Sequence, residues 1–250
     1  MINHAFDASI IAELSTLTEN WYQRIEHLSR VFGSFGLEQH LPDGSVYLPT
    51  ANSISLSTII PIERVLEAFS SNLRKVLTEQ LGDELVCASD IAWARRQFPP
   101  NQGPADAVAH AWHQDGAYGA SFLHPSFLHP SNSQPELLLP MLTVWIPLHD
   151  CGQDAPGIEL LDASLPKLLP PSQLCNQFIQ QAWPKDLFYR PIMTPTDALI
   201  IAADSLHRTY VTEHMTRFRG CVELRFLAAS VFTTPAFAKR ISVNKLIRCW

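Results

Sequence analysis

The C-terminal two thirds of the chain consist of short apolar runs separated by turns, and this pattern limits the fold more than any other feature. The runs follow Gly82: "LVCASDIAWARRQF", "LLPMLTVWIPLHD", "GIELLDAS", "LFYRPIMT", "DALIIAADSLHRTYV" and "RGCVELRFLAAS". Short apolar runs bounded by turn residues are typical of an all-β sandwich or barrel. No glycine-rich phosphate loop follows a strand, so a nucleotide-binding α/β fold has no support.

Two apolar stripes in the first 82 residues predict helices that pack against this β core. The first stripe has helical spacing and comprises Ile10, Leu14, Leu17, Trp21, Ile25 and Leu28. The second predicts a helix from Ile62 to Leu81, with Gly82 at its C-terminal cap. Between them, the segment from Gly33 to about Ser57 is rich in Gly, Pro and Ser and predicts a loop. We expect residues 1–250 to form a single domain, with a helical part at about 1–82 and a β core at about 85–230.

Charge and cysteine usage exclude several classes of protein. The formal charge of the 250 residues is -6, whereas a nucleic-acid binder is expected to carry a basic patch. Five cysteines without a CxxC pair favour reduced thiols over a disulfide framework. The chain has neither a signal peptide at its N-terminus nor an apolar run of about 18 residues. We therefore expect a cytoplasmic protein with no nucleic-acid or membrane partner, and the sequence leaves its oligomeric state open.

The stretch "HAWHQDGAYG", residues 110–119, carries a pair of candidate metal ligands. Side chains at i and i+2 of an extended segment point the same way, so His113 and Asp115 would face one point while Gln114 turns aside. Gly116 then gives the backbone room to turn. His110 is better explained as an outer or solvent-facing histidine. Two ligands cannot hold a catalytic metal alone, so a third must come from elsewhere.

A third ligand is found in "TPTDALIIAADSLHRTYVTEHMTRFRGCVELRFL". There an apolar strand from Ala198 to Ala202 leads through a short polar turn to His207, and the following strand carries Arg219. Two histidines and one carboxylate with open coordination positions are typical of non-haem Fe(II) oxygenases. An arginine nearby can hold a carboxylate through a bidentate fork.

The sequence resembles the phytanoyl-CoA dioxygenase-like family of Fe(II)- and 2-oxoglutarate-dependent oxygenases. The resemblance covers about residues 90–230 and rests on "WHQDG", "TVWIPLHDCGQDAPGIELL", "PTDALIIAADSLH" and "RFRGCVELRF", in this order. The chain departs from the family in "LLDASLP", where Pro-Gly-Ser-His is common, and in Thr196-Asp197, where Gly-Asp is common. The resemblance implies a mainly β double-stranded β-helix (a jelly roll, cupin-like) with N-terminal and flanking α-helices.

The resemblance also implies roles for individual residues. It makes His113, Asp115 and His207 the iron ligands. It assigns the distal carboxylate of 2-oxoglutarate to Arg219, with Arg217, of the same strand parity, as the alternative. Further positions that would contact the cosubstrate or substrate are Thr209, through its hydroxyl, Gln114 and Trp145.

The implied reaction consumes O2 and 2-oxoglutarate and releases succinate and CO2 while a small organic metabolite, such as a natural-product intermediate, is oxidised. Family halogenases carry Gly or Ala in place of the carboxylate ligand, so Asp115 favours hydroxylation, desaturation, epoxidation or cyclisation. We expect loops 99–112, 119–137 and 151–172 to frame the pocket. Two alternatives remain open from the sequence: a zinc or other metal-dependent cupin-like hydrolase without 2-oxoglutarate, and a non-catalytic jelly-roll binding protein.

Overall fold

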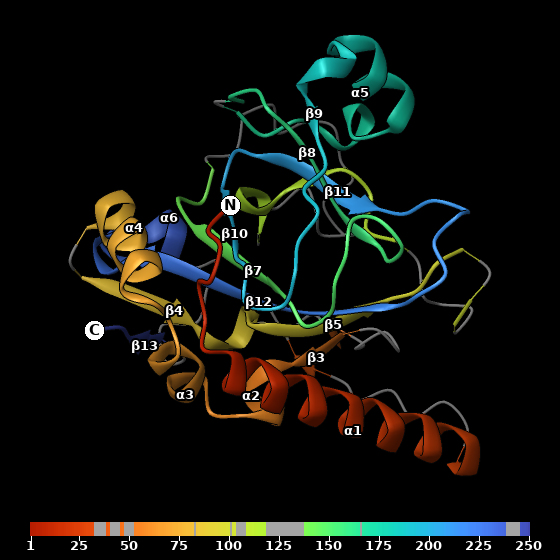
Figure 1. Cartoon of the computed structure of the whole chain (residues 1–250). Coiled ribbons are helices and arrows are strands. Elements are labelled where there is room, and N and C mark those ends of the chain that lie inside the picture. Colours follow the sequence, from red (N-terminus) through yellow and green to blue (C-terminus); the bar gives the residue numbers. More distant parts are fainter. Residues whose placement is uncertain are drawn as a thin grey trace.

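The computed structural model describes residues 1–32, 39–40, 46–47, 53–82, 84–100, 102–103, 109–118, 138–165, 167–238 and 246–250. Two antiparallel sheets face each other (Figure 1). The larger sheet contains β3 (Ser53–Ser55), β4 (Leu85–Ala88), β5 (Trp93–Gln97), β7 (Leu142–Pro147), β10 (Leu199–Ala202), β12 (Arg219–Ala228) and β13 (Leu246–Arg248). The smaller sheet contains, in spatial order, β6 (His113–Gln114), β11 (Leu206–Tyr210), β8 (Gly157–Leu161) and β9 (Phe188–Tyr189). The predicted mainly β jelly roll is confirmed.

Helices cover the outer faces of both sheets. The N-terminal ones are α1 (Ala8–Phe32), α2 (Leu56–Ile59), α3 (Ile62–Glu67) and α4 (Ser71–Leu81), and they share one apolar cluster with the larger sheet. Figure 1 shows α1 running along the side of the larger sheet that lies away from the smaller sheet. The helix α5 (Asn176–Ala182) packs on the outside of the smaller sheet, and α6 (Pro235–Ala238) follows β12. The remaining strands, β1 (Gln39–His40) and β2 (Val46–Tyr47), pair with each other.

The long strand β12 shows how one sheet serves both the core and a site. It pairs with β7 along one edge and with β5 and β4 along the other. Alternate side chains point to opposite faces of a strand. Val222, Leu224 and Phe226 therefore face the helices and are fully buried in the shared apolar cluster. Residues of the opposite parity face the smaller sheet, and among them are Arg219 and Glu223.

The first helix agrees with its prediction except for the identity of the innermost residues. The most buried positions of α1 are Ile11, Leu14, Thr18 and Tyr22, which follow the helical period. The predicted stripe lies along the border of this face, and all its members other than Leu14 that the structure describes are half-buried. The side chain of Leu28 lies outside the described residues.

The second predicted helix is wrong as one continuous element. The chain forms α3 and α4, with a break at Ala68–Ser70 between them. The break has a local cause, because the Ser70 hydroxyl accepts a hydrogen bond from the N–H of Leu73 at 3.2 Å and caps α4. Phe69 pairs instead with Phe6, with ring centroids 4.8 Å apart. The helix ends before Gly82, as expected.

Two further predictions need correction in their boundaries. The strand predicted from "LVCASDIAWARRQF" is two strands, β4 and β5, separated by a 3-10 turn at Ser89–Ile91. The loop predicted up to Ser57 contains β3, which pairs with β5, and the beginning of α2. Most of the rest of that loop lies outside the described residues. Among the described helices, none has the length and apolar character that a membrane span requires.

Candidate functional site

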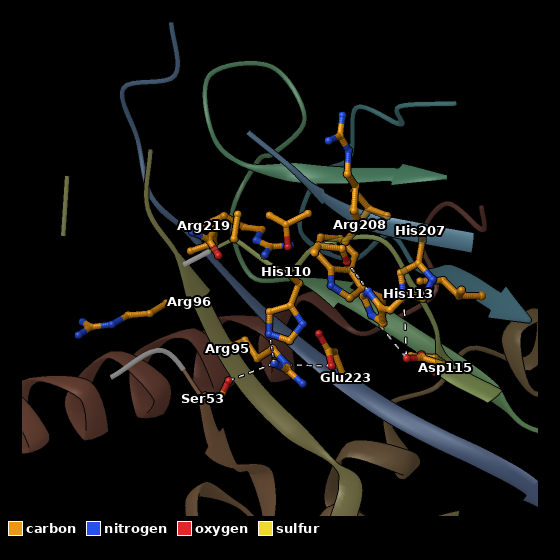
Figure 2. Close-up of a pocket in the computed structure, with 18 of the residues that line it drawn as sticks. Ser53, Arg95, Arg96, His110, His113, Asp115, His207, Arg208, Arg219 and Glu223 are labelled. Carbon is orange, nitrogen blue, oxygen red and sulfur yellow. Dashed lines mark hydrogen bonds and ion pairs between the residues drawn. The ribbon is translucent and has the colours of Figure 1, made fainter. Parts of the chain in front are cut away.

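A cavity of about 480 Å³ lies between the two sheets. Its walls come from β5, β7 and β12 on one side and from β6, β8 and β11 on the other (Figure 2). Most of the lining side chains with polar groups belong to the strands, and they include Arg95, His113, Asp115, Thr143, Trp145, His207, Thr209, Arg219, Glu223 and Arg225. A small cavity with convergent polar groups is the usual form of a small-molecule site.

The structure brings the three predicted metal ligands together. His113 and His207 lie opposite each other on the neighbouring strands β6 and β11. Their Nε2 atoms are 3.8 Å and 4.0 Å from Asp115 Oδ1, and the three ligand atoms lie within 4.8 Å of one another. In the part of the chain that the structure describes, this is the group of histidine, cysteine and acidic side chains that could hold a metal ion.

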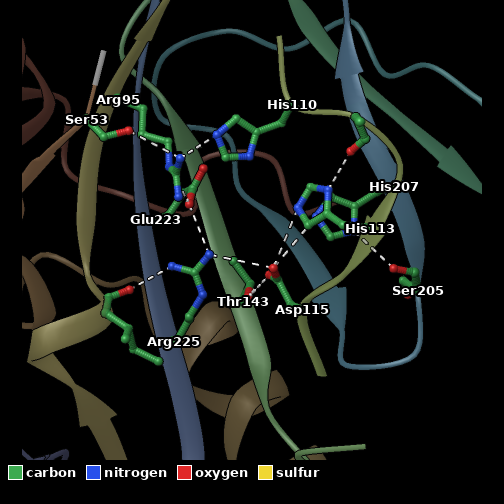
Figure 3. Close-up of polar contacts among 12 residues, drawn as sticks. Ser53, Arg95, His110, His113, Asp115, Thr143, Ser205, His207, Glu223 and Arg225 are labelled. Carbon is green, nitrogen blue, oxygen red and sulfur yellow. Dashed lines mark hydrogen bonds and ion pairs between the residues drawn. The ribbon is translucent and has the colours of Figure 1, made fainter. Parts of the chain in front are cut away.

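Backbone carbonyls fix the orientation of both imidazoles. His113 Nδ1 lies 2.8 Å from the carbonyl of Ala111, and His207 Nδ1 lies 3.0 Å from the carbonyl of Ser205 (Figure 3). A carbonyl can only accept, so each Nδ1 carries the proton and each Nε2 keeps a free lone pair. This second contact is the usual way in which a protein orients a histidine that binds metal.

Asp115 is held in place by the strands of the larger sheet. It begins the 3-10 turn Asp115–Ala117 after β6, and its Oδ2 accepts a hydrogen bond from the hydroxyl of Thr143 on β7. Gly116 allows this turn, because a Cβ there would lie 2.6 Å from Leu138 Cδ2 and 2.7 Å from the carbonyl oxygen of Ala203. The hydroxyl of Thr143 thus occupies Oδ2, and Oδ1 remains for the metal.

Electrostatics keep this group in the protonation state that metal binding requires. Burial alone would raise the pKa of Asp115, but Arg225 and the two histidines hold it well below its usual range. Burial and the neighbouring His207 lower the pKa of His113 to about 3, against the opposing effect of Asp115. The carboxylate is therefore charged and His113 is neutral at physiological pH. Two imidazole nitrogens and one carboxylate oxygen are a donor set that suits iron or zinc.

A chain of alternating charges runs from Asp115 along β12 to β5 (Figure 3). Arg225 Nη2 lies 3.6 Å from Asp115 Oδ1 and donates to Glu223 Oε2 at 3.1 Å. The same Glu223 oxygen accepts from Arg95 Nε at 2.9 Å. Arg95 also contacts Ser53 and, at 2.7 Å, His110 Nε2. Burial alone would raise the pKa of Glu223, but the two arginines lower it to about 2.

Arg219 also lines the cavity, but in the described part of the chain its guanidinium has unpaired nitrogens, unlike those of Arg95 and Arg225. Its side chain is 3% exposed, and its guanidinium lies over the ring of Trp145 at 4.8 Å. Among the described residues, Arg219 Nε and Nη1 have no hydrogen-bond partner, and neither has Trp145 Nε1. Burying an unpaired cationic group is costly. The arrangement fits a ligand with an anionic group that completes these contacts.

The other predicted site residues divide into two sets. Thr209 and Trp145 line the cavity with Arg219. Arg217, the alternative to Arg219, is on the surface, with 56% of its side chain exposed and Asp154 at 3.9 Å. Gln114 does not line the cavity, which corrects the expectation that it contacts a ligand. Its amide turns to the opposite face of β6, where it bonds to Lys167, Leu169 and Asp204 backbone groups.

Arg95 and Arg96 are consecutive residues of β5, so their side chains leave opposite faces of the strand. Arg95 points into the cavity, whereas Arg96 lies over Tyr22 of α1 and pairs with Glu26 at 2.5 Å. The contacts of Thr143 and Arg225 with Asp115 were not predicted. A signal existed for Thr143, which is the polar residue in the apolar run "LLPMLTVWIPL". Of the loops expected to frame the pocket, residues 119–137 lie outside the described part of the chain.

Comparison with known proteins bears on the fold. The sequence matches no family model and no curated protein. The structure is similar to that of EctD from S. alaskensis in its apo form, with a TM-score of 0.61 and 15% identity over 93% of this chain and 73% of EctD. EctD has also been solved with bound Fe and with 2-oxoglutarate and 5-hydroxyectoine.

Two further solved structures are similar to this chain. SnoN, a non-heme alpha-ketoglutarate-dependent epimerase from nogalamycin biosynthesis, has a TM-score of 0.51 and 12% identity over 91% of this chain and 76% of SnoN. EvdMO1 has a TM-score of 0.51 and 15% identity over 86% of this chain, which spans only 44% of EvdMO1. At these identities the likeness concerns the fold, and the chain shares its jelly roll with EctD and SnoN.

Proposed function

We propose that this chain is an Fe(II)- and 2-oxoglutarate-dependent oxygenase that oxidises a small organic molecule. The observation that carries the proposal is the pairing of two features in one cavity. One is the set of three ligand atoms from His113, Asp115 and His207. The other is the buried guanidinium of Arg219, which has two nitrogens without partners. A hydrolase that needs only a metal and water has no use for the second feature.

The residues present fit this pair of groups, and each has a task. The iron would be held by His113, Asp115 and His207. The orientation of these side chains is fixed by their contacts with Ala111, Thr143 and Ser205. Arg219 would bind the distal carboxylate of 2-oxoglutarate, with Trp145 beneath the guanidinium, and Thr209 lines the same cavity. When bound, the iron would supply the redox chemistry that couples oxidative decarboxylation of 2-oxoglutarate to oxidation of the substrate.

The buried surroundings of the site matter for this chemistry. Trp145, Ile158 and Ile201 provide apolar surface in the cavity wall. Apolar walls lower the local dielectric constant, which strengthens the interactions of Arg219 and Asp115 with a bound anion and a cation. Because Asp115 supplies a carboxylate ligand, we propose oxygenation, desaturation, epoxidation or cyclisation rather than halogenation. The whole chain would act as one domain, since the helices and the larger sheet share a core.

The proposal is tested by 2-oxoglutarate turnover. The protein loaded with Fe(II) in air should convert 2-oxoglutarate to succinate slowly even without its substrate, and His207→Ala should lower the rate at least about a hundredfold because a metal ligand is lost. His214→Asn changes an exposed histidine outside the cavity and should leave the rate unchanged. Failure of the iron-loaded wild type to form succinate, together with tight zinc binding and ester hydrolysis, would favour the hydrolase alternative.

A further inference from the structure

The ladder between β7 and β12 ends in an unusual way next to Arg219. The last paired residues are Cys221 and Pro147, and one more backbone bond follows, from the N–H of Leu148 to the carbonyl of Gly220 at 2.9 Å. In an antiparallel ladder such a pair normally exchanges two bonds. Here the N–H of Gly220 donates to the side chain of His149 instead, at 2.9 Å from Nδ1. An imidazole thus takes the place of a backbone carbonyl.

The chain is shaped to let this imidazole approach. A Cβ on Gly220 would lie 3.1 Å from both Nδ1 and Cε1 of His149, which is closer than real Cβ contacts usually are. On its other side the ring packs edge-on against Phe218, with centroids 5.1 Å apart. The His149 ring therefore contacts both neighbours of Arg219 in the chain, the backbone of Gly220 and the side-chain ring of Phe218.

We infer that His149 is a positioning residue for Arg219: its neutral ring accepts from Gly220 and holds the start of β12, so that the guanidinium stays fixed for its carboxylate ligand. The inference rests on the proposed function. It adds a residue that touches neither the metal ligands nor the cavity, since the cavity lining does not include His149. Arg219 has no hydrogen-bond partner of its own on Nε and Nη1, so its position depends on the backbone that carries it.

Protonation gives this contact a signature that a purely structural role lacks. A protonated ring carries hydrogen on Nδ1, so it would present a donor to the N–H of Gly220 and the bond would be lost. His149 also lines a surface groove of about 520 Å³, from which protons can reach it. The charged groups around it are Glu19 of α1, Asp150 of its own loop, and Arg217 and Arg219 at the start of β12. Burial lowers the pKa of His149, the two acids raise it and the two arginines lower it further.

The test measures 2-oxoglutarate affinity in the Fe(II)-loaded protein without oxygen. His149→Asn keeps an acceptor oxygen near the place of Nδ1 but cannot titrate, whereas His149→Phe keeps a ring without an acceptor. At about pH 8 we expect wild-type affinity in His149→Asn and about tenfold weaker binding in His149→Phe, the size of one lost hydrogen bond. Iron affinity should stay unchanged in both, and His214→Asn serves as the control for the His-to-Asn change.

The pH profile separates the outcomes. As the pH falls from about 8 through the range in which NMR shows the His149 ring to become protonated, wild-type affinity for 2-oxoglutarate should fall more than that of His149→Asn, and His214→Asn should follow the wild type. Equal profiles for wild type and His149→Asn, or tighter wild-type binding at low pH, would overturn the inference even if His149→Phe failed to fold. If the wild type itself bound no 2-oxoglutarate in the presence of iron, the proposed function would fail first.

Discussion

The two ends of the cavity differ in how their charges are balanced. At one end, which we call the metal end because it contains the three candidate ligands, charges alternate in sign along Asp115, Arg225, Glu223 and Arg95. Each of these groups has an oppositely charged neighbour within 3.6 Å. At the other end, Arg219 is equally buried but rests only on the ring of Trp145, and two of its nitrogens have no partner among the described residues. The strand β12 contributes to both ends, with Glu223 and Arg225 at the first and Arg219 at the second.

This difference shows which charges are paired by the fold itself and which charge needs a ligand as its partner. The metal end is preorganised, because the protein itself supplies the groups that hold the ligands and keep Asp115 charged. The Arg219 end retains an unsatisfied cation, which lowers the stability of the ligand-free protein and is recovered when an anion binds. Sites that trade stability for binding in this way are common in enzymes.

The largest expected effect comes from Arg219→Met, which removes the unpaired cation and keeps much of its volume. Affinity for 2-oxoglutarate should fall at least about a hundredfold, because a bidentate charged contact is lost. The free energy of unfolding of the apo protein should rise by about 1 kcal/mol, since an uncompensated buried charge is gone. Calorimetric titration and urea unfolding measure the two quantities. A destabilised apo variant would show that the guanidinium is already paired without ligand.

The opposite result is expected for Glu223→Ala at the metal end. Arg95 and Arg225 would lose the carboxylate between them, which should cost about 3 kcal/mol of unfolding free energy. Fe(II) affinity should fall about tenfold, because Arg225 no longer has a fixed place behind Asp115. Urea unfolding and competition with a chromophoric chelator test both. Wild-type stability in this variant would mean that the charges at this end are balanced without Glu223.

The metal end should also make the protein sensitive to acid. The folded pKa of Glu223 is about 2, below its ordinary value of 4.5, so its contribution to stability is complete above 4.5 and is lost as the pH falls toward 2. Glu223→Gln should therefore flatten the decline of unfolding free energy over this pH range. Unfolding at a series of pH values measures the slope, and equal slopes for the variant and the wild type would argue against this role of Glu223.

The smallest effect is expected for Arg217→Ala, which controls for the loss of an arginine near the start of β12. Its side chain is largely exposed and its contact with Asp154 is long. Unfolding free energy should change by less than about 0.5 kcal/mol, and 2-oxoglutarate affinity should stay the same. Strong loss of affinity would instead make Arg217 the carboxylate ligand, the alternative that the sequence left open.

Local patterns in the sequence predicted the fold and the candidate metal ligands. The apolar runs located most of the strands. The i, i+2 spacing of His113 and Asp115 predicted that both side chains face one point, as they do, although Asp115 lies in the turn after β6. The parity of β12 likewise puts Glu223 and Arg225 on one face of the strand, where they form an ion pair at 3.1 Å. These features depend only on backbone periodicity, so they can be read from one segment at a time.

Contacts between distant segments could not be read in the same way. The pairing of Arg225 with Asp115 depends on the register of β12 against β7 and on the turn after β6, which no local pattern sets. The bond between His149 and Gly220 joins segments 71 residues apart, so no local pattern indicates it. The break before α4 was different, because Ser70 offered a capping signal that the continuous apolar stripe concealed.

The most direct measurement is an anaerobic titration of the apo protein with Fe(II) and then 2-oxoglutarate, followed in the visible spectrum. The geometry of the site predicts a weak metal-to-ligand charge-transfer band in the wild type and in Arg217→Ala. The band should vanish in His207→Ala and should be greatly weakened in Arg219→Met at the same 2-oxoglutarate concentration. Absence of the band in the wild type, or an undiminished band in Arg219→Met, would contradict the proposed pairing of metal site and anion site in one cavity.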